Sequence, residues 1–169
     1  MDILAERAAR GEQDALEEMA RMHYADVFRF CARNLNAQMA EDATQDTFMI
    51  AMKQIKRFRG ESELRTWLFG IAMNVCRNHR RKLKNSLPLQ DWDYLHDEIE
   101  DNMISAEVLR NALAKLDDNH REVVLLHEME ELTYEECAHI LRVPVGTVKS
   151  RLYYAFRKLR EIIEGEKSS

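Results

Sequence analysis

Apolar residues recur at intervals of three and four positions along most of the chain, which is the spacing of amphipathic α-helices. In the N-terminal half this pattern predicts helices over residues 16–35, 41–57 and 63–83. Each predicted helix has an apolar stripe that needs a partner, and the inward positions include Met52 and Trp67. We therefore expect the three helices to pack together as one domain over residues 1–83.

The C-terminal part, residues 105–169, shows the same helical spacing in shorter segments. Residues 108–116 and 123–127 predict two helices, the second after a start signal at Asp117 and Asp118. These stripes do not resemble those of the N-terminal half. We expect a second helical domain that is not a copy of the first.

Two further helices are predicted near the C-terminus. In the segment "TYEECAHIL", Thr133 and Glu136 have the spacing of a capping box, and this helix must end before Pro144. The segment "RVPVG" predicts a turn before a last helix over residues 147–163. The expected inward stripe of that helix is Val148, Leu152, Ala155, Phe156, Leu159 and Ile162.

Residues 84–104 differ from both halves, because they combine a proline with dense acidity and lack a sustained helical stripe. They predict an acidic linker between the two domains. The whole chain has only 5 Gly and 2 Pro, so it lacks the turn residues of a β-sandwich or barrel. The predicted fold class is all-α, with two small helical domains.

Charge is arranged in blocks along the chain, although the formal net charge is only −5. Residues 53–84 carry ten basic and two acidic residues, and residues 142–160 carry six basic and no acidic residues. Acidic blocks separate them: residues 85–107 have seven acids and no base, and residues 117–136 have eight acids and one Arg. The two basic blocks indicate contacts with nucleic acid.

The C-terminal basic block coincides with a helix-turn-helix pattern. A short helix, a tight turn with Gly146 and a second helix rich in Lys and Arg place that second helix in a DNA major groove. A solvated basic face on an ordinary bundle helix is the alternative. With the apolar stripe inward, the residues that face outward near the helix start are Lys149, Ser150, Arg151, Tyr153 and Tyr154.

The N-terminal basic block mixes cations with aromatic residues, a combination suited to single-stranded nucleic acid. Trp67 lies on an apolar stripe, so a core position competes with a stacking role, whereas Phe58 beside Gly60 indicates a loop. A dimeric helix-turn-helix regulator would leave this block unexplained. That regulator, and an all-helical adaptor without DNA contact, remain the alternative functions.

Catalytic and membrane signals are missing from the sequence. There is no Gly-rich phosphate loop, Ser-His-Asp order or pair of catalytic carboxylates, so we expect no enzyme and no cofactor. Cys76 and His79 lack the second ligand pair of a zinc site. No apolar segment could enter a membrane, and the dispersed cysteines Cys31, Cys76 and Cys137 suggest buried thiols in a reducing, cytoplasmic protein.

Three segments together resemble one family. "EDATQDTF" and "FRGESELRTWLFGIAMN" resemble the promoter-melting domain of extracytoplasmic-function (ECF) sigma factors, and "LDDNHREVVLLHEMEELTYEECAHILRVPVGTVKSRL" resembles their helix-turn-helix domain. The resemblance covers residues 10–162. It implies an alternative sigma factor that binds core RNA polymerase, recognises promoter DNA and directs transcription initiation, with an anti-sigma factor as regulator.

The resemblance also implies site residues. Those that match the polymerase-docking motif are Gln45, Asp46 and Phe48. Six residues match the part of the family that reads and melts the minus-ten element: Phe58, Arg65, Asn74, Arg77, Arg80 and Arg81. Those that match the minus-thirty-five reading helix are the five outward residues Lys149, Ser150, Arg151, Tyr153 and Tyr154.

The sequence departs from the family pattern at two places. Similar factors often carry a base where Tyr154 and Phe156 stand, and aliphatic residues where Ala43 and Thr44 stand. We expect polymerase docking to tolerate Ala43 and Thr44, whereas Tyr154 and Phe156 affect how the DNA sequence is recognised. The linker of the family enters nucleic-acid channels of the polymerase, so the acidic linker would imitate a strand of phosphates or act as a spacer.

Overall fold

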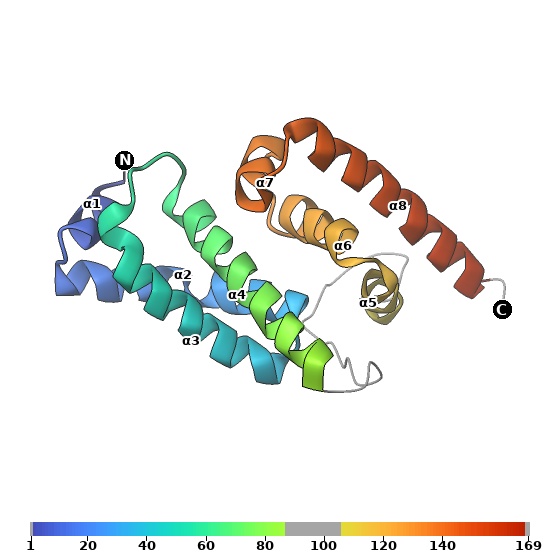
Figure 1. The fold of residues 1–169 in the computed structure, drawn as a ribbon, viewed down its shortest axis with the longest axis horizontal. Helices are drawn as coiled ribbons and strands as arrows, with labels where there is room; N and C mark the ends of the chain where they lie inside the picture. The colour runs from blue at the N-terminus through green and yellow to red at the C-terminus, as the bar shows by residue number, and fades with distance from the viewer. Residues whose placement is uncertain (1, 87–105, 168–169) are drawn as a thin grey trace. The chain divides into compact units, whose positions relative to one another are not determined.

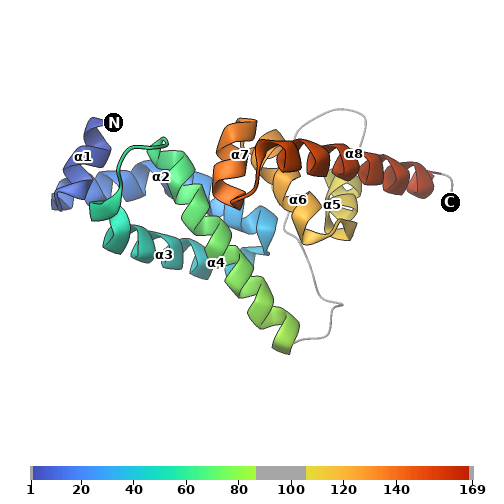
Figure 2. The same cartoon turned by 45° about the horizontal axis from the view of Figure 1, so that its top comes forward.

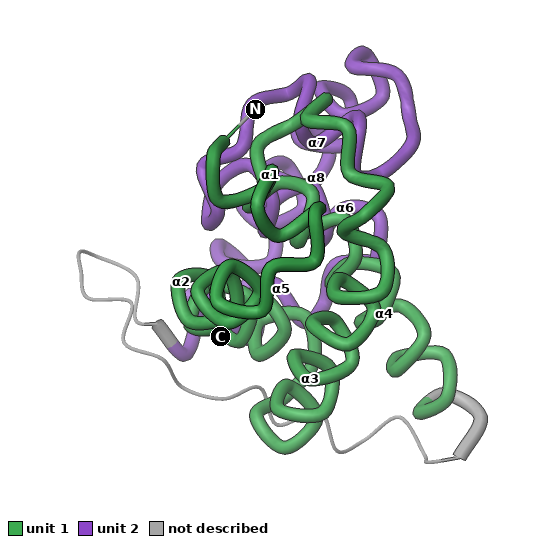
Figure 3. Tube along the Cα trace, turned by 90° about the vertical axis from the view of Figure 1, so that its left-hand side faces the viewer, with its two compact units in different colours: residues 1–93 green, residues 94–169 purple. Residues whose placement is uncertain are grey.

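The computed structural model describes residues 2–86 and 106–167, and the chain divides into two compact units, residues 1–93 and 94–169 (Figure 3). Within the described residues every regular element is helical, which confirms the all-α prediction. The predicted linker lies outside the described residues except at its start, where residues 84–86 continue a helix. In the described ranges no helix combines the length and apolarity needed to cross a membrane.

Unit 1 is built on three long helices that pack against one another (Figure 1). They are α2 (Gln13–Asn34), α3 (Ala37–Gln54) and α4 (Leu64–Ser86), with a 3-10 turn η1 (Ile55–Arg57) after α3. The three predicted N-terminal helices are therefore confirmed. The side chain of Asn36 accepts a hydrogen bond from the amide of Met39 at 2.9 Å, so it caps the start of α3.

A short helix that the hydrophobic pattern did not predict, α1 (Ile3–Ala9), precedes these three and packs on α2 and η1. Its start is marked by Asp2, whose side chain accepts from the amide of Leu4 at 3.2 Å. Its end leads to Gly11, which adopts a φ of 83° that glycine tolerates without strain. Seven residues span only two turns, which is too short for a clear stripe.

The core of unit 1 centres on Phe30 of α2 and Phe69 of α4, both fully buried with ring centroids 5.0 Å apart. Met52 was expected to face inward, and that expectation is wrong because its side chain is exposed. Trp67 is half-buried and packs against Phe58, with ring centroids 5.2 Å apart. Phe58 and Trp67 of the first basic block therefore form one contact at the start of α4.

Buried hydroxyls on α3 explain its departure from the family pattern. Ala43 and Thr44 are fully buried, and the Thr44 hydroxyl donates to the carbonyl of Ala40 at 2.6 Å. Thr47 donates to the carbonyl of Ala43 at 2.7 Å in the same way. Each hydroxyl is thus satisfied within its own helix, which removes the cost of burying it.

Unit 2 contains α5 (Ala106–Lys115), α6 (Asp118–Val124), a π-helical turn η2 (Leu125–Met129), α7 (Tyr134–Leu141) and α8 (Val145–Lys167). The long α8 packs against α5, α6 and α7, as Figure 2 shows. The Thr133 half of the predicted capping box of α7 is confirmed, because the Thr133 hydroxyl accepts from the amide of Glu136 at 3.1 Å.

The turn between α7 and α8 differs from the prediction. Helix α8 begins at Val145, so Gly146 lies in its first turn, and the left-handed residue of the turn is Arg142, with a φ of 56°. The stripe of Val148, Leu152, Ala155 and Leu159 is buried as expected. Phe156 was expected in the same stripe, and that expectation is wrong because its side chain is exposed.

Candidate nucleic-acid and protein interfaces

One surface of α3 carries the predicted polymerase-docking residues. We call it the α3 outer face; its exposed members recur at helical spacing and are Gln45, Asp46, Met49 and Met52. The Asp46 carboxylate lies 3.0 Å from Nε2 of His79 on α4. Phe48 borders this face, three residues after Gln45 and four before Met52, but its side chain is buried and stacked on Tyr24 with ring centroids 6.0 Å apart. Of the three predicted residues, Gln45 and Asp46 are exposed and Phe48 supports them from the core.

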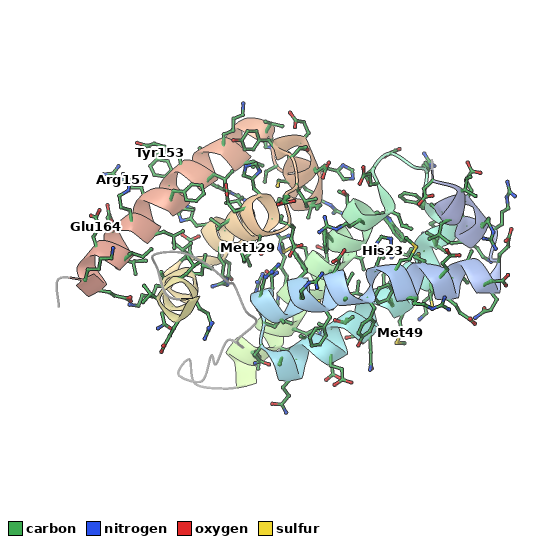
Figure 4. All side chains as sticks on the ribbon, turned by 180° about the vertical axis from the view of Figure 1, so that it is seen from behind. His23, Met49, Met129, Tyr153, Arg157 and Glu164 are labelled. Atoms are coloured by element: carbon green, nitrogen blue, oxygen red, sulfur yellow. The ribbon has the colours of Figure 1, made fainter. Side chains whose placement is uncertain are left out.

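Exposed apolar side chains were not among the predicted site residues, yet unit 1 has several. Met49 and Met52 belong to the α3 outer face, and Met22 and Tyr24 of the adjacent α2 are exposed as well. Figure 4 shows the side chain of Met49 at the surface of unit 1. Met49 lies four residues after Gln45, and this helical spacing could have identified it as a member of the same exposed face. Exposed apolar groups among polar ones mark a protein-binding surface.

A second surface follows α4. Asn74 and Arg81 are exposed and Arg77 is half-buried, and their spacing places them along one side of the helix. Arg80 differs from them, because it is only 3% exposed and its Nη1 lies 3.4 Å from Oδ1 of Asn34 on α2. The expectation that Arg80 lies along DNA is therefore corrected: its side chain is part of the packing between α2 and α4.

Arg65 is held at the start of α4 by two contacts. Its Nε lies 3.3 Å from Oδ2 of Asp26 on α2, and its guanidinium carbon lies 4.4 Å from the centre of the Phe69 ring. Phe58 and Trp67 pack together in the same segment. The predicted minus-ten residues Phe58 and Arg65 are thus fixed in position by neighbouring side chains.

The predicted DNA-reading side of α8 is on the surface of unit 2. Lys149, Ser150, Tyr153 and Tyr154 are exposed and Arg151 is half-buried. The Lys149 ammonium lies 5.4 Å from the centre of the Tyr134 ring of α7, and this ring stacks on His127 at 4.6 Å. Residues 142–160 of this side carry no acid. The surface is suited to a polyanion.

The three cysteines are buried free thiols. Cys76 is buried and His79 contacts Asp46, and within residues 2–86 and 106–167 no three His, Cys, Asp or Glu side chains are grouped to hold a metal ion. Burial raises the pKa of the Cys137 thiol to about 12, and the charge of Glu136 adds to the shift.

This pKa predicts a slow reaction of Cys137 with alkylating reagents. Only the thiolate reacts, so at pH 8 we expect modification at least about a hundredfold slower than that of an unperturbed thiol. Because the folded pKa lies above the ordinary value of 9.0, the neutral thiol stabilises the fold below that pH, and this stabilisation is lost toward pH 12. Peptide mass spectrometry after timed iodoacetamide labelling, with urea-unfolded protein as reference, measures the rate; equal rates in both states would contradict the assignment.

Both halves of the chain match known families. The family described as "Sigma-70 region 2" matches residues 19–86, and the family described as "Sigma-70, region 4" matches residues 106–159. The chain is 32% identical to RNA polymerase sigma factor YlaC of Bacillus subtilis over 88% of its length and 92% of the relative's. It is 30% identical to the ECF RNA polymerase sigma-E factor of Haemophilus influenzae over 96% of its length and 93% of the relative's.

Two solved structures have the same fold. CnrH, solved in complex with the cytosolic domain of CnrY, aligns with a TM-score of 0.72 and 26% identity over 96% of both chains. The sigma factor RpoE of Bartonella quintana, solved with the anti-sigma factor NepR, aligns with a TM-score of 0.73 and 25% identity over 88% of this chain and 96% of its own. Two helical units with these matches in this order are the architecture of a sigma factor with regions 2 and 4. The chain therefore belongs to the extracytoplasmic-function class of RNA polymerase sigma factors, which act in promoter recognition and transcription initiation.

Proposed function

We propose that this chain binds core RNA polymerase through the α3 outer face, reads and opens the minus-ten element with α4, and reads the minus-thirty-five element with α8. The observation that carries the proposal is that each of these surfaces is exposed on a unit that matches the corresponding sigma-factor region. The chain supplies binding groups, and the polymerase performs the chemistry, in the cytoplasm where promoter DNA lies.

The α3 outer face supports polymerase docking because it joins polar and apolar groups. Met49 and Met52 are large and exposed, and Gln45 and Asp46 lie beside them. Interfaces commonly have such an apolar centre with a polar rim, and Met adapts to irregular partners. Phe48 contributes by keeping α3 packed against α2, without touching the polymerase itself.

The α4 surface supports contact with the melted strand. Asn74 can hydrogen-bond to a base edge, and Arg77 and Arg81 can follow the sugar-phosphate backbone. Flipping a base out of the duplex requires about a few kcal/mol, which a fixed aromatic and cationic site can offset. The Phe58–Trp67 contact and the Arg65–Asp26 pair keep the site at the start of α4 ordered before DNA arrives.

We also propose an anti-sigma factor as a regulatory partner. The two solved relatives support it, since one is a complex with an anti-sigma factor and the other a complex with the cytosolic domain of a second protein. Co-purification of the tagged chain from its host tests this. A stoichiometric small protein in addition to the polymerase subunits is expected, and recovery with polymerase alone would count against it.

The whole proposal is tested by adding the purified chain and core RNA polymerase to a library of random promoter-like DNA and sequencing the start regions of the transcripts. We expect enriched promoters with two elements that depend on the chain. Tight binding of DNA without polymerase, together with no new transcripts in its presence, would favour the dimeric regulator instead.

Met49→Ala is expected to weaken binding to core RNA polymerase about fivefold to tenfold, as truncation of a buried interface side chain does. The fold should persist because Met49 is exposed. Fluorescence anisotropy of the labelled chain measures the affinity. The matched control is Met49→Leu, which keeps the apolar volume and should bind within about twofold; an equal loss in both variants would contradict an apolar contact.

Arg151→Ala is expected to leave polymerase affinity unchanged and to weaken discrimination at the minus-thirty-five element. A lost base contact there corresponds to about 1–3 kcal/mol, or roughly fivefold to 150-fold in promoter affinity. Transcription from promoters with intact and scrambled upstream elements measures the discrimination. If Arg151→Ala impairs polymerase binding as much as promoter choice, the assignment of α8 to DNA fails.

A further inference from the structure

Three large aromatic side chains are exposed within four residues of α8. Tyr153 is 65% exposed, Tyr154 is 52% exposed and Phe156 is 43% exposed. The rings of Tyr153 and Tyr154 meet edge to face, with centroids 5.3 Å apart and planes at 82°. Aromatic rings at the surface of a monomer are unfavourable in water, so a cluster of this kind indicates a surface that another molecule covers.

The polar and basic side chains around these rings contact neighbours within unit 2. The Lys149 ammonium lies 5.4 Å from the centre of the Tyr134 ring, and the Ser150 hydroxyl donates to the carbonyl of Thr147 at 3.0 Å. Nε of Arg157 lies 3.6 Å from the Glu161 carboxylate, on the next turn of the helix. The two tyrosine rings therefore occupy the exposed centre of this side, with cations at its margins.

The basic side chains beside the tyrosine rings are suited to contact the phosphates of a DNA backbone. Tyr153 and Arg157 are four residues apart and lie on the side of α8 that faces away from α6 (Figure 4). Arginine and lysine at the margins can approach the phosphates, which leaves the rings facing the floor of the groove. Residues 142–160 contain no acid, so the nearest acid along α8 is Glu161, which pairs with Arg157 one turn beyond the rings.

The floor of the major groove presents one apolar group that an aromatic side chain can contact. In the major groove, guanine presents two acceptors that Arg or Lys recognises, whereas thymine presents a C5-methyl group that apolar side chains contact. Two rings 5.3 Å apart span one to two base steps, since bases rise by about 3.4 Å per step. The rings can thus contact methyl groups on neighbouring or alternate thymines.

We propose that Tyr153 and Tyr154 determine the specificity of this chain for the upstream promoter element by contacting thymine C5-methyl groups in the major groove. This inference rests on the proposed function of α8 as the upstream-reading helix. It assigns the aromatic pair a base-reading role where a basic side chain would select guanine.

The test uses the full chain with core RNA polymerase and a promoter selected from the random library. Each thymine of the upstream element is replaced in turn by deoxyuridine, which lacks only the methyl group. At one or two positions we expect promoter affinity to fall about fourfold per methyl group, the effect of removing one buried methylene-sized group. Thymines flanking the element serve as controls and should show no change.

Variants of the chain identify the ring responsible. Tyr154→Ala and Tyr153→Ala should each bind the thymine promoter more weakly and lose the difference between thymine and deoxyuridine at one position. Tyr154→Phe keeps the ring and should retain that difference. If the Phe variant behaves as the Ala variant does, the hydroxyl rather than the ring reads the DNA, and the proposal is overturned.

Different outcomes overturn the methyl contact and the sigma-factor function. Active transcription from a selected promoter whose upstream element lacks thymine, or responds to no deoxyuridine substitution, overturns the methyl contact and leaves the sigma-factor function intact. No chain-dependent transcription from any promoter overturns both.

Discussion

Asp46→Lys is expected to lower the affinity of the chain for core RNA polymerase at least about thirtyfold, because truncating or reversing a charge within an interface typically changes binding by 2–5 kcal/mol. Asp46 lies on the α3 outer face beside Met49, and its side chain is 52% exposed. The variant should therefore fold. Anisotropy with labelled chain and core polymerase gives the affinity, and the loss of chain-dependent transcripts should follow it.

The control for this variant is His79→Gln. Asp46 pairs with His79 at 3.0 Å, so Asp46→Lys removes an internal contact as well as a surface charge. His79→Gln removes the imidazole from this contact and leaves the Asp46 carboxylate on the surface. Near-wild-type binding by His79→Gln, within about twofold, is expected because a surface contact of this kind contributes little. A loss as large as that of Asp46→Lys would show that the contact with residue 79 matters and the surface charge does not.

Phe69→Ala is expected to destabilise unit 1 by about 3–5 kcal/mol, the usual cost of removing a buried Phe ring. Phe69 is fully buried against Phe30 and also lies beneath the Arg65 guanidinium. Hydrogen exchange measured by mass spectrometry reports the loss helix by helix. Amides of α2 and α4 should exchange faster, and amides of α6 and α8 should be unchanged because they belong to unit 2.

Phe69→Leu keeps most of the volume and should cost less than about 1.5 kcal/mol. A loss below about 1 kcal/mol in Phe69→Ala would mean that the site collapses around the deletion. Equal faster exchange in both units would contradict their separate stability. At the promoter, Phe69→Ala should impair opening more than docking, since Arg65 loses the ring that positions it.

The long helices were predictable because their stripes extend over many turns. Helix α2 repeats its apolar positions from Ala15 to Cys31, and packing against α1, α3 and α4 buries this stripe. Helix α1 escaped prediction because seven residues with three buried positions are too few to show a helical period. The length of the segment, rather than its hydrophobicity, kept this helix from being predicted.

The errors on side-chain burial have two causes. Met52 and Phe156 were placed inward because apolar residues near a stripe usually extend it, yet both are exposed on surfaces that we assign to partners. Arg80 was expected along DNA because the family resemblance implies it, yet its long side chain reaches Asn34 inside unit 1. Residue type gives the average environment, and a binding surface or a buried polar contact departs from it.

The site itself was predicted partly through residue patterns and partly through the family resemblance. Lys149, Tyr153 and Tyr154 follow from the helical spacing opposite Val148 and Leu152, and all three are exposed. Gln45 and Asp46 come from the resemblance alone, because neither spacing nor composition distinguishes them from other polar surface residues. The contact of Arg65 with Asp26 joins α4 to α2 across 39 residues of sequence, a separation that local patterns do not encode.

The contact between Asp46 of α3 and His79 of α4 joins the proposed docking helix to the proposed strand-capturing helix. The two helices also pack directly, so they form one body with two working surfaces. Immobilising α3 on the polymerase would then fix the backbone that carries Asn74 and Arg81, so that only their side chains lose conformational entropy when DNA binds. The opened strand would meet its receptor already aligned and at high effective concentration. Promoter melting would thus be coupled to polymerase assembly through rigidity, without any moving part in this unit.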